Sequence, residues 1–509
     1  MTEHLKWLDF VVIGLSFGLM LYCGVKCSSK NKSSEDYFMG GRKMPGWMVG
    51  FSILATMISS IGFIAVPGFA YKENWRFLAQ YISFVIPLII AIFVFIPFYR
   101  KNNLSTAYEF LEKRYGAWAR FYTSGILVIN QLFFVGTVLY MVCLPIQVAT
   151  GWNLYLIIVI FAIIVAFYTV LGGLEAVIWT DVIQGIALFL GAIITVPIIC
   201  HYLPGGFSQI IEQARLDNKM SLGSLEPTFV GKNFWVMFIT GMAGYLVVYS
   251  TNQTYIQRYA APANIYQARK AMLMGSFCYL PIMFYFLLIG TSLYVYYKQF
   301  PSEAIASLKP EQIFPYFILT KVPTGFAGLI FVGLLAAAMS TLDSILNACA
   351  SMITFDFYRR LVKPNASETH YLNFGKLATL ILSFLMIFTA ILMSCNNQGT
   401  ILDALFLMGI FSAIGIFPMF MLGFFTTKVH SKAMAIGLCT EILIAAVWLF
   451  LHSDVGRNIL PVAALRLPDL FWLGIICDTI VMILTYFISC ILRDKNPKNL
   501  TGITIWTTK

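Results

Sequence analysis

The polar residues with the clearest chemical pattern lie inside an apolar segment of the chain. Within residues 325–353 they recur at steps of three and four positions: Ser340, Asp343, Ser344, Asn347 and Ser351. That spacing places them along one face of a helix. A carboxylate on such a face must contact protein or water, because exposing it to lipid costs about 3 kcal/mol or more. Hydroxyl, carboxylate and carbonyl oxygens suit a hard cation such as sodium.

A second cluster of oxygens within the membrane surrounds Asp181, which has Thr180 before it and Gln184 three residues after it. Both Asp181 and Asp343 also have a plainer interpretation, in which the carboxylate caps or hydrogen-bonds a neighbouring helix. The residues by themselves leave that alternative open.

Two apolar segments contain residues that weaken a continuous helix. In the first, residues 48–71, the stretch 55–62 contains Thr56, Ser59, Ser60 and Gly62 and is followed by Pro67 and Gly68. In the second, residues 235–257, the glycines at 241 and 244 are followed by the polar stretch 250–253. Irregular backbone inside a bilayer is tolerated only where protein or a water-filled cavity satisfies it. Paired interruptions five helices apart indicate an inverted-repeat transporter, although glycines also serve close helix packing.

The elements that position these residues are thirteen apolar runs, and each is long enough to cross a bilayer core of about 30 Å. They are 8–27, 48–71, 77–99, 121–148, 154–171, 176–200, 235–257, 270–296, 325–353, 374–394, 402–425, 433–451 and 471–492. Hydrophobic residues make up 59% of the 509 residues and charged residues only 11%, so little is left for a soluble domain. We expect an all-α protein that crosses the membrane many times.

The net charge of +11 is explained by where the basic residues lie, and we expect no nucleic-acid partner. If the N-terminus is outside and the runs alternate, the inside loops and tail contain 23 of the 34 Lys and Arg residues. This positive-inside bias predicts a plasma-membrane protein with its N-terminus outside and its C-terminus in the cytoplasm.

Several motifs give the chain a resemblance to the sodium/solute symporter family. They are Asp36-Tyr37-Phe38-Met39-Gly40-Gly41 with Pro45-Gly46-Trp47, the stretch from Tyr168 to Gln184, Gln257-Arg258-Tyr259, and the stretch from Ala336 to Ser344. The motifs span essentially the whole chain in the family's order. The pattern resembles bacterial members that transport sialic acid or sugars.

The resemblance implies a LeuT-type fold with two inverted repeats of five helices. The implied divisions are a leading helix and cytoplasmic loop (1–47), a first repeat (48–200), an extracytoplasmic loop (201–234), a second repeat (235–425), and two trailing helices with a tail (426–509). It also implies a principal sodium site formed by backbone oxygens of Ala55, Ile58 and Ser340 with the side chains of Asp343 and Ser344. An additional sodium site, seen in some members, would join Asp181 to Ser340, Asp343 and Ser344.

Two positions depart from the family pattern. Asp343 stands where the family commonly has Ser or Thr, so the charge beside the cation differs. Phe134 stands where the sialic-acid branch has an arginine that grips the substrate carboxylate, and a phenyl ring cannot replace a bidentate guanidinium. The candidates for a solute pocket, with Phe134, are Ser59, Gln80, Asn130, Gln131, Asn252 and Gln253.

We therefore predict a sodium-coupled symporter, not an enzyme, that imports a sugar, polyol or sugar acid. It would act as a monomer in the bilayer, with sodium and the solute as its ligands. A membrane-embedded enzyme is a rival, but all five histidines lie in predicted tails, loops or helix ends. A channel needs a continuous pore lining. A sensor that binds solute without moving it would use the same pocket.

Overall fold

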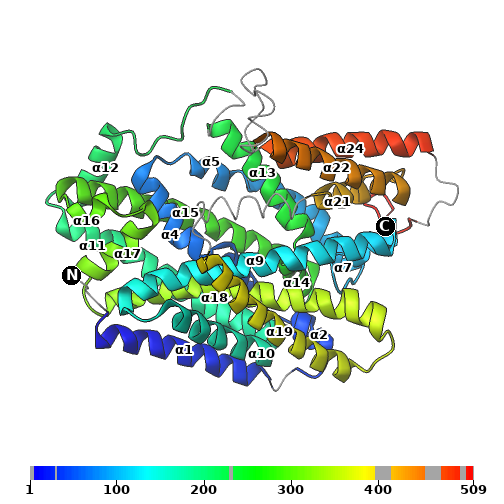
Figure 1. Cartoon of the computed structure of the whole chain (residues 1–509), viewed down its shortest axis with the longest axis horizontal. Coiled ribbons are helices and arrows are strands. Elements are labelled where there is room, and N and C mark those ends of the chain that lie inside the picture. The colour runs from blue at the N-terminus through cyan, green and yellow to red at the C-terminus, as the bar shows by residue number, and fades with distance from the viewer. Residues whose placement is uncertain are drawn as a thin grey trace.

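The computed structural model describes residues 5–28, 31–227, 233–395, 414–452, 472–492 and 500–507. Within these ranges the regular structure is helical, apart from an isolated bridge between Met44 and Pro262. The predicted all-α architecture is confirmed, and Figure 1 shows the helices packed side by side.

The first part of the chain forms thirteen of the described elements. They are α1 (Trp7–Ser28), α2 (Ser34–Met39), η1 (Gly40–Arg42), α3 (Gly46–Met57), α4 (Ser60–Lys72), α5 (Phe77–Ile82), α6 (Val85–Ile90), η2 (Ala91–Phe95), α7 (Ile96–Lys101), α8 (Glu109–Tyr115), α9 (Ala117–Thr150), α10 (Leu154–Ile193) and α11 (Thr195–Tyr202).

The remaining described elements follow. They are α12 (Gly206–Leu216), α13 (Phe234–Thr251), α14 (Gln253–Ala260), α15 (Ile265–Gln299), α16 (Glu303–Ala306), α17 (Pro310–Lys321), α18 (Phe326–Met352), η3 (Ile353–Val362), α19 (Glu368–Cys395), α21 (Ile416–Phe425), α22 (Ser431–His452) and α24 (Leu473–Leu492).

Among the described residues, ten helical stretches are long and apolar enough to cross a membrane, or eleven if the bent pair α3 and α4 is one span. Three of the thirteen predicted runs account for this difference of two. Residues 402–413 of the run 402–425 lie outside the described residues, and the runs 154–171 and 176–200 fall within one long helical stretch. The count of thirteen is therefore not confirmed.

The long helix α10 is interrupted at the boundary between those two predicted runs. Gly173 has φ 58° and ψ −156°, a left-handed conformation that glycine adopts without steric cost. The carbonyls released there are held by other residues, since Asn31 Nδ2 donates to Gly172 O at 3.0 Å and the Tyr37 hydroxyl donates to Thr169 O at 3.2 Å. A straight helix of this length would extend about 60 Å, twice the bilayer core.

The first predicted interruption, in residues 48–71, is present as a 55° bend between α3 and α4. Ile58 has an extended backbone, with φ −109° and ψ 106°, and Ser59 begins α4 by accepting a hydrogen bond from Gly62 N. The helix α3 therefore ends inside the protein, where its last carbonyls have no further helical turn to bond to.

The second predicted interruption lies elsewhere than expected. The helix α13 runs straight through Gly241 and Gly244 and ends at Thr251, and Asn252 separates it from α14. Gly241 instead allows close packing, because a Cβ there would lie within 2.9 Å of Gln80 and Ser83 on the neighbouring segment. The Asn252 side chain begins α14 by accepting from Thr254 N at 2.9 Å.

The helix with the polar face, α18, is enclosed on all sides. All of its residues are buried except Phe326 and Leu329. It packs against α10, α1, α9, α19 and α3, and Figure 1 shows it between α9 and the pair α1 and α10. Asp9 of α1 fixes its first turn, since Asp9 Oδ1 accepts from Gly325 N at 2.7 Å and from Gly328 N at 2.8 Å.

Candidate ion and solute site

The bend between α3 and α4 lies directly against the polar face of α18. The Ser340 hydroxyl donates to Ala55 O at 3.0 Å, and both residues are buried. One turn further along α18, the Ser344 hydroxyl lies 3.4 Å from the Thr56 hydroxyl. Ile58 N contacts the same Ala55 carbonyl at 3.2 Å. The structure thus brings one carbonyl of the broken helix and two hydroxyls of α18 into one small region.

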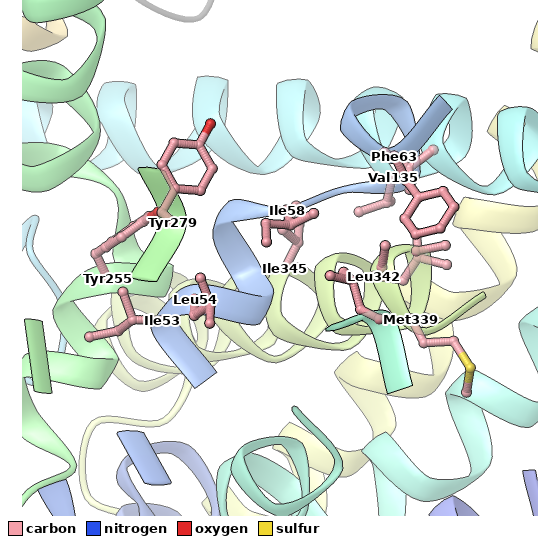
Figure 2. Close-up of a cluster of buried hydrophobic side chains, with 14 of the residues drawn as sticks. Ile53, Leu54, Ile58, Phe63, Val135, Tyr255, Tyr279, Met339, Leu342 and Ile345 are labelled. Carbon is pink, nitrogen blue, oxygen red and sulfur yellow. The ribbon is translucent and has the colours of Figure 1, made fainter. Parts of the chain in front are cut away.

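Apolar side chains surround this region. Figure 2 shows Ile58 at the bend with Ile345 of α18 close to it, and Phe63, Val135 and Leu342 grouped to one side. All five are buried, with exposed fractions of 6% or less. Polar contacts in such surroundings are stronger than in water, and unsatisfied polar atoms cost more.

Asp343 is fully buried and points its carboxylate at two hydroxyls. Oδ2 accepts from the Tyr168 hydroxyl of α10 at 2.8 Å, and Oδ1 accepts from Ser344 at 3.3 Å. The donors hold the carboxylate between α10 and α18, next to Ser344. Together, Ala55, Ser340, Asp343 and Ser344 offer the carbonyl, hydroxyl and carboxylate oxygens that a hard cation prefers.

Asp181 is held differently, by a buried ion pair. Its Oδ2 lies 3.0 Å from Arg258 Nη2 and also accepts from the Ser52 hydroxyl. Arg258 additionally donates to Ser344 Oγ at 2.6 Å and to Ser52 Oγ at 2.8 Å. Asp181 therefore reaches α18 through an arginine.

The proposed solute-pocket residues fall into two groups. Gln131, Asn252 and Gln253 line a common cavity of about 10 Å³, which has room for about one water molecule. Gln253 is engaged by its surroundings, because its Oε1 accepts from Ala107 N at 2.9 Å and its Nε2 donates to Ser105 O at 3.2 Å and Ser351 Oγ at 3.3 Å.

The other four candidates do not line that cavity. Ser59 begins α4, and the Cγ of Gln80 lies against Gly241 of α13. Asn130 and Phe134 are on α9 and half-buried, and Phe134 packs on the hydrophobic core.

Sequence reasoning missed two residues that organise the site. The predicted runs 235–257 and 270–296 leave Arg258 in an inside loop, yet it is 1% exposed and lies in α14. Tyr168 appeared only as part of a motif. A signal for Arg258 was available, because a carboxylate buried at Asp181 requires a counter-charge or several donors, and Gln257-Arg258-Tyr259 was a recognised motif.

Comparison with known proteins decides the class of this site. The model of the sodium:solute symporter family matches residues 37–440. This chain belongs to that family. It is therefore a multi-pass membrane transporter of the sodium-coupled symporter class, and the enzyme alternative falls away.

Among curated relatives, a sodium/sialic acid symporter of Proteus mirabilis is 31% identical, over 86% of this chain and 88% of its own length. A sodium/sialic acid symporter of Aliivibrio fischeri is 29% identical over 96% of this chain and 94% of its own length. A sodium/glucose cotransporter of Vibrio parahaemolyticus is 27% identical over 98% of this chain.

Among solved structures, the substrate-bound outward-open state of a sodium-coupled sialic acid symporter has a TM-score of 0.87. It is 28% identical to this symporter and covers 97% of it, with 99% of its own chain covered. A nucleobase-cation-symport-1 family transporter in a closed conformation has a TM-score of 0.58 at 17% identity, which shows a shared fold. The LeuT-type architecture expected from the sequence is supported by these neighbours.

Proposed function

We propose that this symporter imports a sugar, polyol or sugar acid together with sodium, by alternating access. The observation that most supports the proposal is the 3.0 Å contact between Ser340 Oγ and Ala55 O, which joins the bend in α3 and α4 to the polar face of α18. A cation bound there would connect two helices that must move relative to each other when the site changes its access.

Ala55, Ile58, Ser340, Asp343 and Ser344 are the proposed sodium ligands. The buried carbonyl, hydroxyl and carboxylate oxygens fit sodium by their chemistry, and Asp343 adds a full negative charge to them. A site that selects sodium over potassium is expected to bind the ion directly through these oxygens.

Sodium supplies enough free energy for accumulation. At about 100 mV each inward charge yields about 2.3 kcal/mol, and a tenfold sodium gradient adds about 1.4 kcal/mol. One ion thus supports roughly 500-fold accumulation of a neutral solute.

The solute class rests on the relatives and on position 134. The two sialic acid symporters support a sugar acid, whereas Phe134 offers no cation to a carboxylate. Gln131 and Asn252, with Ser59, Gln80 and Asn130, are suited to hydroxyl groups, which neutral sugars, polyols and sugar acids share.

We propose the same chain organisation that the family resemblance implies. Thirteen spans would comprise a leading helix, the repeats 48–200 and 235–425 in inverted orientation, and two trailing helices. The N-terminus would lie outside and the C-terminus in the cytoplasm, and a monomer would suffice for transport.

The test is uptake of labelled solutes into proteoliposomes that contain the purified protein. The panel includes sialic acid, glucose and a polyol, each measured with inward sodium and with potassium in its place. We expect uptake of one class that depends on sodium and increases with an inside-negative potential. Equal uptake in potassium, with no response to potential, would contradict symport. Binding without uptake would instead indicate a sensor.

A further inference from the structure

Arg258 is a permanent positive charge beside the ion site. Its side chain is fully buried, and three of its nitrogen atoms donate hydrogen bonds. Nε donates to Ser52 Oγ at 2.8 Å, Nη1 to Thr254 O at 3.0 Å, and Nη2 to both Asp181 Oδ2 at 3.0 Å and Ser344 Oγ at 2.6 Å. A guanidinium is not deprotonated in proteins, so this charge is fixed.

The family resemblance implies an additional sodium site, and Nη2 of Arg258 donates hydrogen bonds to two of the residues that would form it. That site would use Asp181 with Ser340, Asp343 and Ser344, and both Asp181 and Ser344 already face the guanidinium. A sodium ion bound to both of these oxygen atoms would lie against a positive charge, whereas the sodium at Asp343 would share only Ser344 Oγ with the guanidinium. The residues present therefore do not fit a second cation while Arg258 keeps its position.

The charges of the cluster lead to the same conclusion. When both are ionised, Asp181 and Asp343 carry two negative charges against the one positive charge of Arg258. Among the ion pairs of the described residues, neither aspartate contacts another basic group. The cluster thus lacks one positive charge, and a single sodium at Asp343 would make it neutral. A second sodium would leave an excess positive charge in a buried region, which is strongly disfavoured.

We propose that Arg258 is a built-in cation that takes the place of the second sodium, so that one sodium ion accompanies each solute. The proposal rests on the proposed sodium-coupled transport and adds its stoichiometry. One observation favours the opposite conclusion: Asp181 Oδ1 is buried and has no hydrogen-bond partner among the residues that the structure describes. A water molecule can satisfy that atom, and it is the one oxygen of Asp181 that Arg258 leaves free.

The first experiment measures the ratio of radioactive sodium to labelled solute that enters proteoliposomes through the wild-type protein. We expect one sodium per solute. A ratio of two with wild-type protein would overturn the proposal and leave symport intact. Uptake without any sodium dependence would instead overturn the proposed function, so the two failures are distinguishable.

The second experiment substitutes Arg258 and counts bound sodium on the purified protein by equilibrium dialysis, which does not depend on transport. Arg258→Gln removes the charge and opens the site, so binding should rise from one sodium to two per protein. Arg258→Lys keeps a charge and should bind one.

Two further variants control for the loss of a buried arginine. The double variant Arg258→Gln with Asp181→Asn lacks the anion for a second ion and should bind one sodium. Arg120→Gln removes another buried arginine, one paired with Asp356, and should leave the count at one. Folding of Arg258→Gln is judged by a monodisperse elution profile. If this variant folds and still binds one sodium, Arg258 does not take the place of a second sodium ion. If it does not fold, the wild-type ratio decides.

Discussion

At the scale of single residues, Asp343 is the position where this chain adds a charge to a site of hydroxyls and carbonyls. Asp343→Ala should weaken sodium activation of uptake by about 30-fold or more, since losing a buried charged partner costs about 2 kcal/mol or more. Asp343→Ser, which restores the ligand expected for the family, should retain transport with an intermediate sodium requirement. The measurement is the sodium concentration that gives half-maximal uptake. Unchanged sodium affinity in a folded Ala variant would remove Asp343 from the site.

Tyr168 is expected to hold Asp343 in place through its 2.8 Å hydrogen bond. Tyr168→Phe should lower stability by about 1.5–3 kcal/mol, the usual contribution of a hydrogen bond to a charged group. Because sodium can then compensate the unsatisfied carboxylate, added sodium should raise the melting temperature of the variant more than that of the wild type.

A matched control for Tyr168 is Tyr37, whose buried hydroxyl donates to backbone carbonyls at 3.2 Å. Tyr37→Phe should lower the melting temperature without changing the effect of sodium. Equal sodium effects in the two variants would show that Tyr168 does not act through the carboxylate.

The side chain at position 134 leads to a prediction about which solutes are transported. Phe134→Arg would place a bidentate donor where a phenyl ring now packs on the core. We expect lower uptake of neutral sugars, and a ratio of acidic to neutral uptake that rises above the wild-type value. Competition by sialic acid against a labelled neutral sugar measures this ratio. If wild-type uptake of an acidic sugar is lost on removing another Arg or Lys in the pocket, that residue is the clamp.

At the scale of elements, a buried charged cluster fastens the end of α18 to its neighbours. Asp356 of η3 is fully buried and accepts from Arg120 of α9, from Thr106 at 2.6 Å and from Ser124 at 2.7 Å. Arg120 also pairs with Glu112 of α8 at 2.7 Å. The cluster thus joins the helix of the ion site to α8 and α9.

Asp356→Asn should release that end of α18, because breaking a buried ion pair costs about 3–5 kcal/mol. Hydrogen exchange of the amides in residues 353–362 should become faster, measured by mass spectrometry in detergent. Arg360→Gln is the control, since Arg360 makes a half-exposed contact with Glu112 at 2.8 Å and exposed pairs contribute little. Equal exchange in both variants would show that Asp356 does not fasten the helix.

The same elements show what sequence patterns can and cannot predict. The three- and four-residue spacing of polar residues identified the polar face of α18, and the serines and glycine within 55–62 identified the bend. These are local properties of the chain. The glycines at 241 and 244 misled, because α13 continues through both, and Gly241 serves close packing against Gln80 instead of interrupting the helix. Arg258 was misplaced because its partner Asp181 is 77 residues away in sequence, and sequence periodicity does not report such a contact.

At the scale of the whole molecule, the number of spans determines whether the two termini share a side of the membrane. Eleven spans are counted in the described residues when α3 and α4 form one. The break at Gly173 would divide the 154–202 stretch into two spans, and the predicted run 402–425 would add another. The total of thirteen is odd, so the termini should lie on opposite sides.

The basic residues predict which side each terminus occupies. Clusters such as Arg359 and Arg360 in η3, and Lys428 and Lys432 around the start of α22, lie in parts of the chain that the positive-inside rule assigns to the cytoplasm. With short epitopes on the full-length chain, an N-terminal epitope should bind antibody on intact cells. A C-terminal epitope should bind only after permeabilisation. An epitope on a cytoplasmic protein controls for leakage. If both epitopes were accessible on the same side, the number of spans would be even. Either the division of the helix at Gly173 into two spans or the predicted span 402–425 would then be wrong.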